Sequence, residues 1–157
     1  MASTSDGDFS HAPWLMCHAG SHLCAMPIAQ VSETMRALPI EAVAGAPPGV
    51  LGVAMIRGAP VPVVDLGYVL GGTASQFKFF ITIKADARTI ALAVDAVVGI
   101  RLIGAQTYKA LPPLLRDAAN ETITGIAARD AALTLFLSAS RIVSPEVLAH
   151  LESEKAA

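Results

Sequence analysis

Two cysteines and two histidines lie within eight residues of each other in the stretch CHAGSHLC, which runs from Cys17 to Cys24. Thiol and imidazole groups at this density are typical ligands of a soft metal ion, and two neighbouring thiols can also form a redox pair. A metal site requires that the ligand atoms converge on one point. The course of the backbone therefore decides between these chemical functions and a purely structural one.

This stretch is expected to form a β-hairpin, because the apolar runs WLMCH and HLCAM flank a glycine-containing turn. Successive side chains of a strand point to opposite faces. With a turn at AGS, His18, His22 and Cys24 share one side. With a turn at GS alone, Cys17, His22 and Cys24 share one side instead. Neither register brings all four together, and the spacing matches no common zinc motif.

Three of these side chains could still bind a metal ion, or the two cysteines could pair across the strands. The simpler interpretation is that the cysteines fill a small apolar core and the histidines flank a turn. We predict the simpler arrangement, with no metal site.

The rest of the sequence contains no recognisable catalytic motif. It has no GxSxG nucleophile turn, no P-loop and no GxGxxG motif. Asp65 and Asp95 each end an apolar run. A carboxylate in that position more often accepts hydrogen bonds from the N–H groups of an adjacent turn than it takes part in catalysis. We therefore expect no catalytic residue, no cofactor and no enzyme activity.

Composition narrows the class of protein further. Of the 157 residues, 54% are hydrophobic and 15% are charged, and the net charge is −2, which does not favour binding to nucleic acid. No apolar run is long enough to span a membrane, and the N-terminus does not resemble a signal peptide. These features predict a cytoplasmic protein with reduced cysteines. The apolar excess indicates a large core or an apolar surface for partners.

Most of the chain from Trp14 onwards is expected to form short β-strands, because apolar runs alternate with glycine and proline. Beyond the cysteine hairpin, we expect hairpins over residues 52–66, 77–103 and 125–143. The first of these has a tight turn at Arg57–Gly58. Two prolines in its second strand are typical of an edge or bulged strand.

Two short helices are also expected. Residues 27–38 begin with proline, and Ile28, Val31 and Met35 share one helical face. Residues 144–155 begin with serine and proline followed by glutamate, which is typical of a helix N-terminus.

An internal repeat is faintly visible. Residues 52–65 and residues 125–138 have the same length, and each consists of glycine, an apolar residue, alanine, a turn containing arginine and an apolar strand. The repeat suggests two similar β-lobes. Any two hairpins would share this much, so the repeat alone is weak support.

The segment VLGVAMIRGAPVPVVDLGYVLG, residues 50–71, resembles the signature of the CheW-like domain, which reads roughly G-V-x-N-L-R-G-x-x-x-P-V-x-D-L. Met55 stands where the signature has asparagine. The following residues match its other defining positions: Gly52, Val53, Ile56, Arg57, Gly58, Pro62, Val63, Asp65 and Leu66.

Three further segments resemble this family in the same order along the chain. Residues 28–50 resemble its helix and connector, residues 90–100 its VD-x-V strand, and residues 123–148 its final hairpin and helix. Ser138 stands where the last strand of the family usually has an acid. The resemblance covers about residues 14–152.

The resemblance implies a mainly β fold of two small five-stranded β-barrel subdomains that share a core, with a short helix and a C-terminal helix. This domain would span residues 14–152, between a disordered tail at 1–13 and a short tail at 153–157. The resemblance also implies a non-enzymatic adaptor that couples methyl-accepting chemoreceptors to the histidine kinase CheA, in receptor arrays at the inner membrane. Its partners would be the receptor's cytoplasmic hairpin tip, the regulatory domain of CheA and other CheW-like domains.

The residues that the resemblance implies for partner binding are Arg57, Val31, Glu33 and Gly58. Arg57 occupies a hairpin tip, where its planar guanidinium can form fixed hydrogen bonds, and Glu33 matches a family acid that could pair with it. Gly58 would provide the backbone geometry of the turn. Since an exposed ion pair adds little stability, a binding function for Arg57 is favoured slightly over one that only pins the turn. Val31 is equally consistent with a core position.

Three other functions remain open on the sequence. The chain could be a CheW-like adaptor of a different chemosensory system, such as one that controls pili or development. It could be a small metal-binding β-barrel enzyme that uses the Cys17–Cys24 cluster. It could also be a small barrel that holds a ligand or an unrelated partner.

Overall fold

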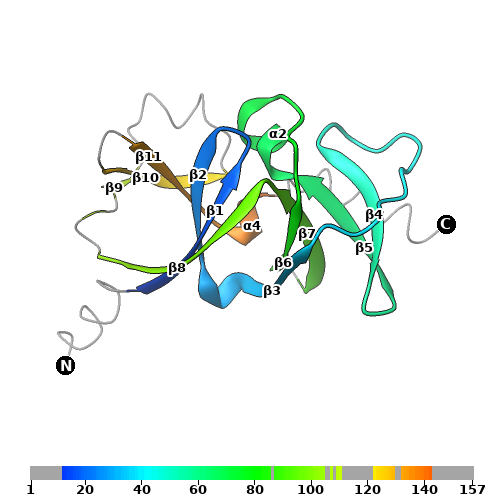
Figure 1. Cartoon of the computed structure of the whole chain (residues 1–157), viewed down its shortest axis with the longest axis horizontal. Coiled ribbons are helices and arrows are strands. Elements are labelled where there is room, and N and C mark those ends of the chain that lie inside the picture. The colour runs from blue at the N-terminus through cyan, green and yellow to red at the C-terminus, as the bar shows by residue number, and fades with distance from the viewer. Residues whose placement is uncertain are drawn as a thin grey trace.

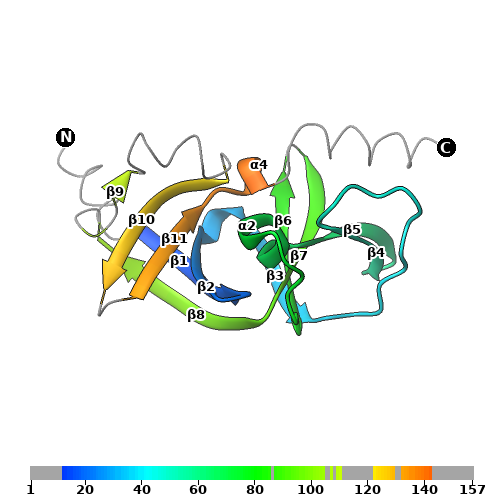
Figure 2. The same cartoon turned by 90° about the horizontal axis from the view of Figure 1, so that it is seen from above.

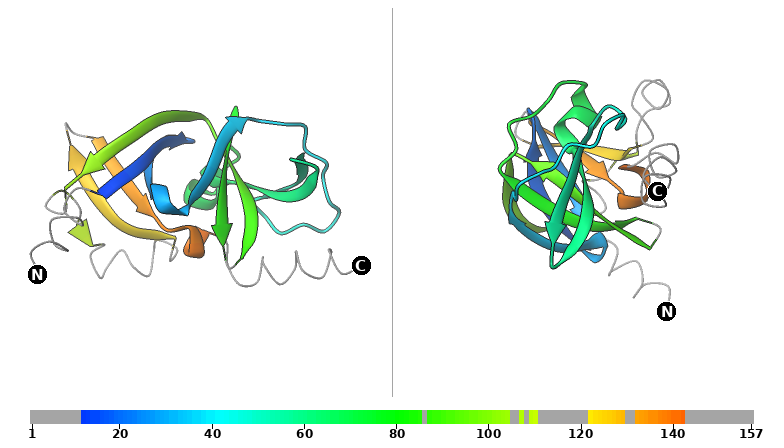
Figure 3. Two further views of the ribbon diagram at one scale, coloured as in Figure 1. Left: turned by 90° about the horizontal axis from the view of Figure 1, so that it is seen from below. Right: turned by 90° about the vertical axis from the view of Figure 1, so that its right-hand side faces the viewer.

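The computed structural model describes residues 12–85, 87–104, 107, 109–110, 122–129 and 132–142. Within these ranges the strands form two sheets that lie side by side along the long axis of the molecule (Figure 1 and Figure 3). The prediction of a mainly β fold with two subdomains and a shared core is confirmed.

The first sheet has six strands in the order β8-β1-β2-β11-β10-β9. Their bounds, in that order, are Ala96–Ile103, Ala12–Ala19, His22–Pro27, Ala132–Leu137, Ile123–Arg129 and Lys109–Ala110. The second sheet has five strands in the order β3-β6-β7-β5-β4. Their bounds are Val31–Arg36, Phe79–Ala85, Arg88–Val94, Ala59–Asp65 and Val50–Ile56. The helices among the described residues are η1 (Ile28–Gln30), α2 (Leu66–Gly71) and α4 (Ala139–Ile142).

Each sheet is completed by a strand that continues from a hairpin of the other sheet. The β1–β2 hairpin belongs to the first sheet, but the next strand, β3, pairs with β6 of the second sheet. The β6–β7 hairpin belongs to the second sheet, and the next strand, β8, crosses to pair with β1 (Figure 2). Neither sheet is therefore formed by one continuous half of the chain.

The internal repeat corresponds to two equivalent hairpins, β4–β5 and β10–β11. Each has a register shift just before its glycine, between Val50 and Gly52 in one case and between Ile123 and Gly125 in the other. The second strand of each hairpin then pairs in parallel, β5 with β7 and β11 with β2. The weak sequence repeat thus reflects the same hairpin placed in both sheets.

The main core lies between the two sheets. Residues of the β1–β2 hairpin and of strands β6 and β7 meet there, including Leu15, Cys17, Cys24, Met26, Ile81, Ile83, Ile90 and Leu92. A second core packs against the other face of β6 and β7, with Phe80, Ala91, Ala93, Val61 and Val63 among its members. Strands buried on both faces need apolar residues at nearly every position, which explains the continuous apolar runs FFITI and IALAV.

The helix predicted over residues 27–38 is wrong. Only Ile28–Gln30 form a single 3-10 turn, and Val31–Arg36 are the edge strand β3. Exposure alternates residue by residue along β3, as expected for a strand with one covered face. The apolar spacing fits a helix equally well, but pairing with β6 satisfies the backbone groups of this segment, so the tertiary context selects the strand.

Helix α2 was not expected from the sequence. Asp65 caps its N-terminus, and its C-cap, Gly72, has a φ of 77°, a conformation that favours glycine. The predicted hairpin over residues 125–143 ends earlier than expected, at Leu137, and α4 follows it. Strand β1 begins at Ala12 rather than at Trp14.

The predicted helix over residues 144–155 and the predicted tails lie outside the described residues. The exceptions are Ala12 and Pro13 of the predicted N-terminal tail, which begin β1. In the part of the chain that the structure describes, no helix combines the length and the apolar character needed to cross a bilayer.

Candidate functional site

Arg57 and Gly58 form the tight turn between β4 and β5, as the sequence predicted. Ile56 pairs with Ala59 directly below the turn. Both turn residues have positive φ, 52° for Arg57 and 78° for Gly58, which is the conformation of the two-residue turns that best fit the twist of a hairpin. The turn holds the Arg57 side chain at the outside of the molecule, where it is 79% exposed.

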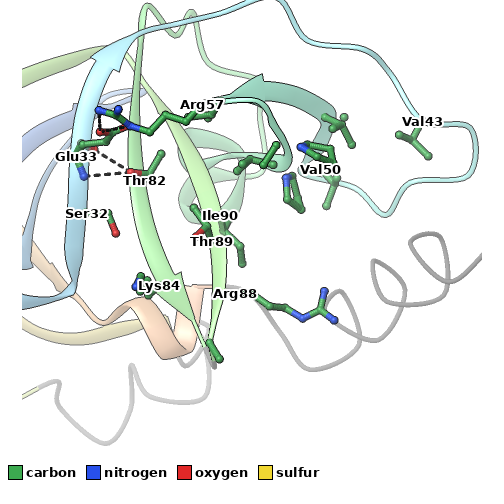
Figure 4. Close-up of a pocket in the computed structure, with 18 of the residues that line it drawn as sticks. Ser32, Glu33, Val43, Val50, Arg57, Thr82, Lys84, Arg88, Thr89 and Ile90 are labelled. Atoms are coloured by element: carbon green, nitrogen blue, oxygen red, sulfur yellow. Dashed lines mark hydrogen bonds and ion pairs between the residues drawn. The ribbon is translucent and has the colours of Figure 1, made fainter.

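The Arg57 guanidinium forms a bidentate ion pair with the carboxylate of Glu33 (Figure 4). Its Nε donates to Oε1 and Oε2 at 3.1 and 3.0 Å, and its Nη2 donates to Oε2 at 2.7 Å. These hydrogen bonds and the positive charge of Arg57 lower the pKa of Glu33, and the carboxylate correspondingly raises the pKa of Arg57. The family resemblance suggested this pairing, but the predicted helix at Glu33 is wrong, because Glu33 lies on β3.

The ion pair joins the two opposite edges of the second sheet. Glu33 lies on β3, the first strand of the sheet order, and Arg57 lies in the turn of the last two strands. Because no backbone pairing connects β3 with β4 or β5 among the strand pairings of the described residues, this side-chain contact bridges the opening between the two edges. It therefore fixes the position of the β4–β5 turn relative to β3.

The backbone at Glu33 is itself fixed by Thr82. The Glu33 N–H donates to Thr82 Oγ1 at 3.1 Å, and the Thr82 hydroxyl donates to the Glu33 carbonyl at 3.3 Å. Thr82 is buried on β6, so the acid is attached to the interior of the sheet even though its carboxylate is partly exposed.

Val31 lies on the opposite face of β3 from Glu33. A register shift between the two places Val31 opposite Ile83 and Glu33 opposite Thr82, and neighbouring residues of β6 point to opposite faces. Val31 is half-buried and packs against the main core. The structure thus brings Arg57, Glu33 and Gly58 together and places Val31 apart from them.

A groove of about 850 Å³ begins beside the ion pair and extends between β3, β6 and β7 on one side and the β4–β5 hairpin on the other (Figure 4). Its walls are mostly apolar, and include Val43, Val50, Val53, Val61 and Ile90. Lys84 and Arg88 also line it.

Exposed apolar side chains mark a second surface, which the sequence analysis did not identify. On β8, an edge strand of the first sheet, Val98, Ile100 and Leu102 are 44%, 62% and 68% exposed and alternate along one face. On the second sheet, Met55 is 60% exposed beside the Arg57 turn. The alternation in AVVGIRLI could have shown a one-sided strand, but not that its apolar face would remain uncovered.

The cysteine hairpin adopts the register with a turn at Gly20–Ser21. Cys17 lies directly opposite Cys24, and both are free, fully buried members of the main core, as predicted. His18 is exposed and opposite Leu23. In the described ranges no three histidine, cysteine or acidic side chains are placed to hold a metal ion.

The two acids that end apolar runs both accept hydrogen bonds from turns, as predicted. Asp65, which is 1% exposed, accepts from the N–H of Tyr68 at 3.2 Å, and from the N–H and hydroxyl of Ser75 at 3.0 and 2.6 Å. Asp95 accepts from the N–H of Gly20 at 2.7 Å. These contacts give both carboxylates a structural function.

Comparison with known proteins agrees with this arrangement of sheets. Among protein families, the CheW-like domain matches residues 13–146. Among solved structures, the crystal structure of the scaffolding protein TtCheW from Thermoanaerobacter tengcongensis is similar, with a TM-score of 0.73 and 20% sequence identity over 87% of this chain and 95% of that chain. At this identity the likeness concerns the fold. A search of curated proteins found no match.

Proposed function

The chain belongs to the CheW-like domain family, and from this premise we propose that it is a non-enzymatic adaptor that couples methyl-accepting chemoreceptors to the histidine kinase CheA. In this proposal it binds the cytoplasmic hairpin tip of the receptor and the regulatory domain of the kinase, within receptor arrays at the inner membrane. It acts by holding its partners in a defined geometry and catalyses no reaction.

The Arg57–Glu33 pair is the main structural observation that supports the proposal, and it assigns partner binding to particular residues. A bidentate pair whose acid is held through Thr82 presents a guanidinium in one orientation on the exposed β4–β5 turn. Exposed ion pairs contribute little to stability, so stability alone is a weak reason for such an arrangement. A fixed guanidinium is well suited to recognising a carboxylate or a carbonyl group of a partner.

An adaptor that links two proteins needs two separate surfaces. The exposed apolar stripe of β8 belongs to the first sheet, and Met55 and the Arg57 turn belong to the second. Apolar side chains at the centre of a patch supply much of the binding energy in protein interfaces, with polar groups around them giving specificity. We therefore assign partner binding to these two surfaces, one on each sheet.

The signal would pass through this adaptor because the two states of the receptor contact it differently. A ligand or partner shifts a conformational equilibrium only to the extent that it binds the two states with different affinity. Each contact can be modest in area, since an array of many linked copies adds avidity.

Co-sedimentation with a receptor cytoplasmic fragment and CheA tests the proposal. We expect the wild-type chain to join the complex. Arg57→Ala and Arg57→Glu should reduce its incorporation while lowering the melting temperature only by the small amount that loss of an exposed ion pair causes. Arg36→Ala is the matched control, because Arg36 is an exposed arginine at the other end of β3. If the wild type joins neither partner, the adaptor function is wrong. If Arg57→Ala melts earlier but still binds fully, Arg57 only pins the turn.

A further inference from the structure

Cys17 and Cys24 are two thiols that the adaptor function does not use. They are Cα partners in the antiparallel β1–β2 hairpin, so their side chains point to the same face. Both residues are 0% exposed and belong to the core that the two sheets share. Strand β1 also pairs with β8, and β2 with β11, so the hairpin is held from both sides.

This position brings the two Cα atoms within the range that a disulfide bond allows. Residues directly opposite each other in an antiparallel pair have Cα atoms about 4.5 or 5.5 Å apart. A disulfide needs a separation of about 4.4–6.8 Å, with side chains directed toward each other. The two-residue turn, and the His18 carbonyl that accepts from Asp95 rather than from β2, make Cys17–Cys24 a hydrogen-bonded pair. Its Cα separation of about 5.5 Å lies within the disulfide range, but its Cβ atoms must approach by up to about 1 Å for the bond to form.

We propose that Cys17 and Cys24 form a cross-strand redox site, in which a peroxide converts the two thiols into an intrachain disulfide within the native fold. In the first step one sulfur attacks a peroxide oxygen, the O–O bond breaks, and a sulfenic acid and one water form. In the second step the other sulfur attacks the sulfenic sulfur, the S–S bond forms, and the hydroxyl leaves with the remaining thiol proton as a second water. The two sulfurs together lose two electrons, and the peroxide gains them.

The fold also determines how fast this site reacts. The thiolate is the reactive form of cysteine, and a hydrogen bond with Cys17 together with burial raises the pKa of the Cys24 thiol well above its usual range. The oxidant must therefore reach the pair through local opening of the β1–β2 hairpin. The site responds slowly in the folded protein and faster when the first sheet opens.

A disulfide at this position would act on both sheets. The turn of the same hairpin is tied to the second half of the molecule, because the Gly20 N–H donates to Asp95 at 2.7 Å and Gly20 packs closely against Gly67 of α2. The bond would thus restrict a hairpin that contributes to the shared core and also contacts the junction between β7 and β8.

Treating the native full-length protein with hydrogen peroxide tests the proposal. After quenching, the protein is unfolded in guanidinium, alkylated with iodoacetamide and weighed by mass spectrometry. We expect a monomer that is lighter by two hydrogen atoms, takes up no alkyl group and keeps its far-ultraviolet circular dichroism. Dithiothreitol should restore both alkylation sites, and urea below the unfolding transition should increase the oxidation rate.

Cys17→Ala and Cys24→Ala are the matched controls, and each should keep a single thiol and lose no hydrogen. The proposal is overturned if the native wild type keeps both thiols under conditions that oxidise the unfolded chain. It is also overturned if the products are sulfinic acids or disulfide-linked dimers, or if oxidation abolishes the β-sheet signal. These wild-type measurements stand even where a variant fails to fold, and none of them involves a chemosensory partner.

Discussion

At the scale of single residues, the Arg57–Glu33 pair is fixed by three hydrogen bonds between two flexible side chains. The pair is not visible in the sequence, because its partners are 24 positions apart and belong to different strands or turns. The family resemblance suggested the pair, but neither composition nor spacing did. The cysteine hairpin shows the opposite case, since alternation along two strands narrowed the possibilities to two registers and the structure selected one of them.

The ion pair predicts a pH dependence with a definite sign. The folded state lowers the pKa of Glu33, so the stability contributed by the pair is fully present above the ordinary pKa of glutamate, about 4.3, and is lost as the pH falls below it. Melting temperatures of the wild type and of Glu33→Gln should therefore differ most near neutral pH and converge in acid. A difference that stays constant from neutral to acid pH would show that the carboxylate charge contributes nothing.

Gly58 and Gly52 of the signature are needed for different reasons, and alanine substitutions at the two positions should show different losses of stability. A Cβ at Gly58 would meet no atom within 4 Å, but its φ of 78° is unfavourable for alanine, so Gly58→Ala should cost about 1 kcal/mol in urea unfolding. A Cβ at Gly52 would overlap the carbonyl group of Glu41, so Gly52→Ala should cost more. Gly58→Asn serves as the control, because asparagine tolerates positive φ. Equal losses for the two alanine variants would contradict this assignment.

At the scale of elements, the sequence located the hairpins well and the helices poorly. The glycine of a tight turn such as Arg57–Gly58 carries a local signal, since glycine is one of the few residue types that suit positive φ. Residues 27–38 carry no such signal, and their apolar spacing fits both a helix and a strand. Pairing with β6 decides the outcome, and that pairing involves residues about 50 positions later. Helix α2 is only six residues long and has too few apolar positions to show a period.

Helix α2 should depend on the carboxylate of Asp65. Replacing it with alanine would remove the acceptor for the backbone of Tyr68 and for two donors of Ser75 in a nearly inaccessible place. We expect Asp65→Ala to lower the free energy of unfolding by about 2 kcal/mol or more, and Asp65→Asn to lower it less, because asparagine keeps one acceptor oxygen. Urea titration measures both values. Equal losses for alanine and asparagine would mean that the side chain contributes by its volume and not as a cap.

At the scale of the whole molecule, the exchange of strands between sheets makes the two subdomains dependent on each other. The first sheet takes in β8, which follows the β6–β7 hairpin of the second sheet, and the second sheet takes in β3, which follows the β1–β2 hairpin of the first. Cores in both sheets share β6 and β7 as a central layer, because one face of these strands belongs to each core. An adaptor built in this way can transmit a displacement at one partner surface to the other without a hinge between its halves.

The same architecture predicts that the two sheets unfold together. Trp14, the single tryptophan, packs edge to face against Phe136 in the first sheet, with 4.8 Å between the ring centroids. Its fluorescence therefore reports on that sheet. Val63→Ala truncates a fully buried residue in the core of the second sheet and should cost about 2 kcal/mol. If the sheets are coupled, the urea midpoint from Trp14 fluorescence should shift as far as the midpoint from circular dichroism.

Leu133→Ala, at an exposed hairpin end, is the control and should shift neither midpoint. If the fluorescence midpoint stays in place while circular dichroism shows an earlier transition, the two sheets unfold independently. A rigid connection between the two proposed partner surfaces could then no longer explain signalling.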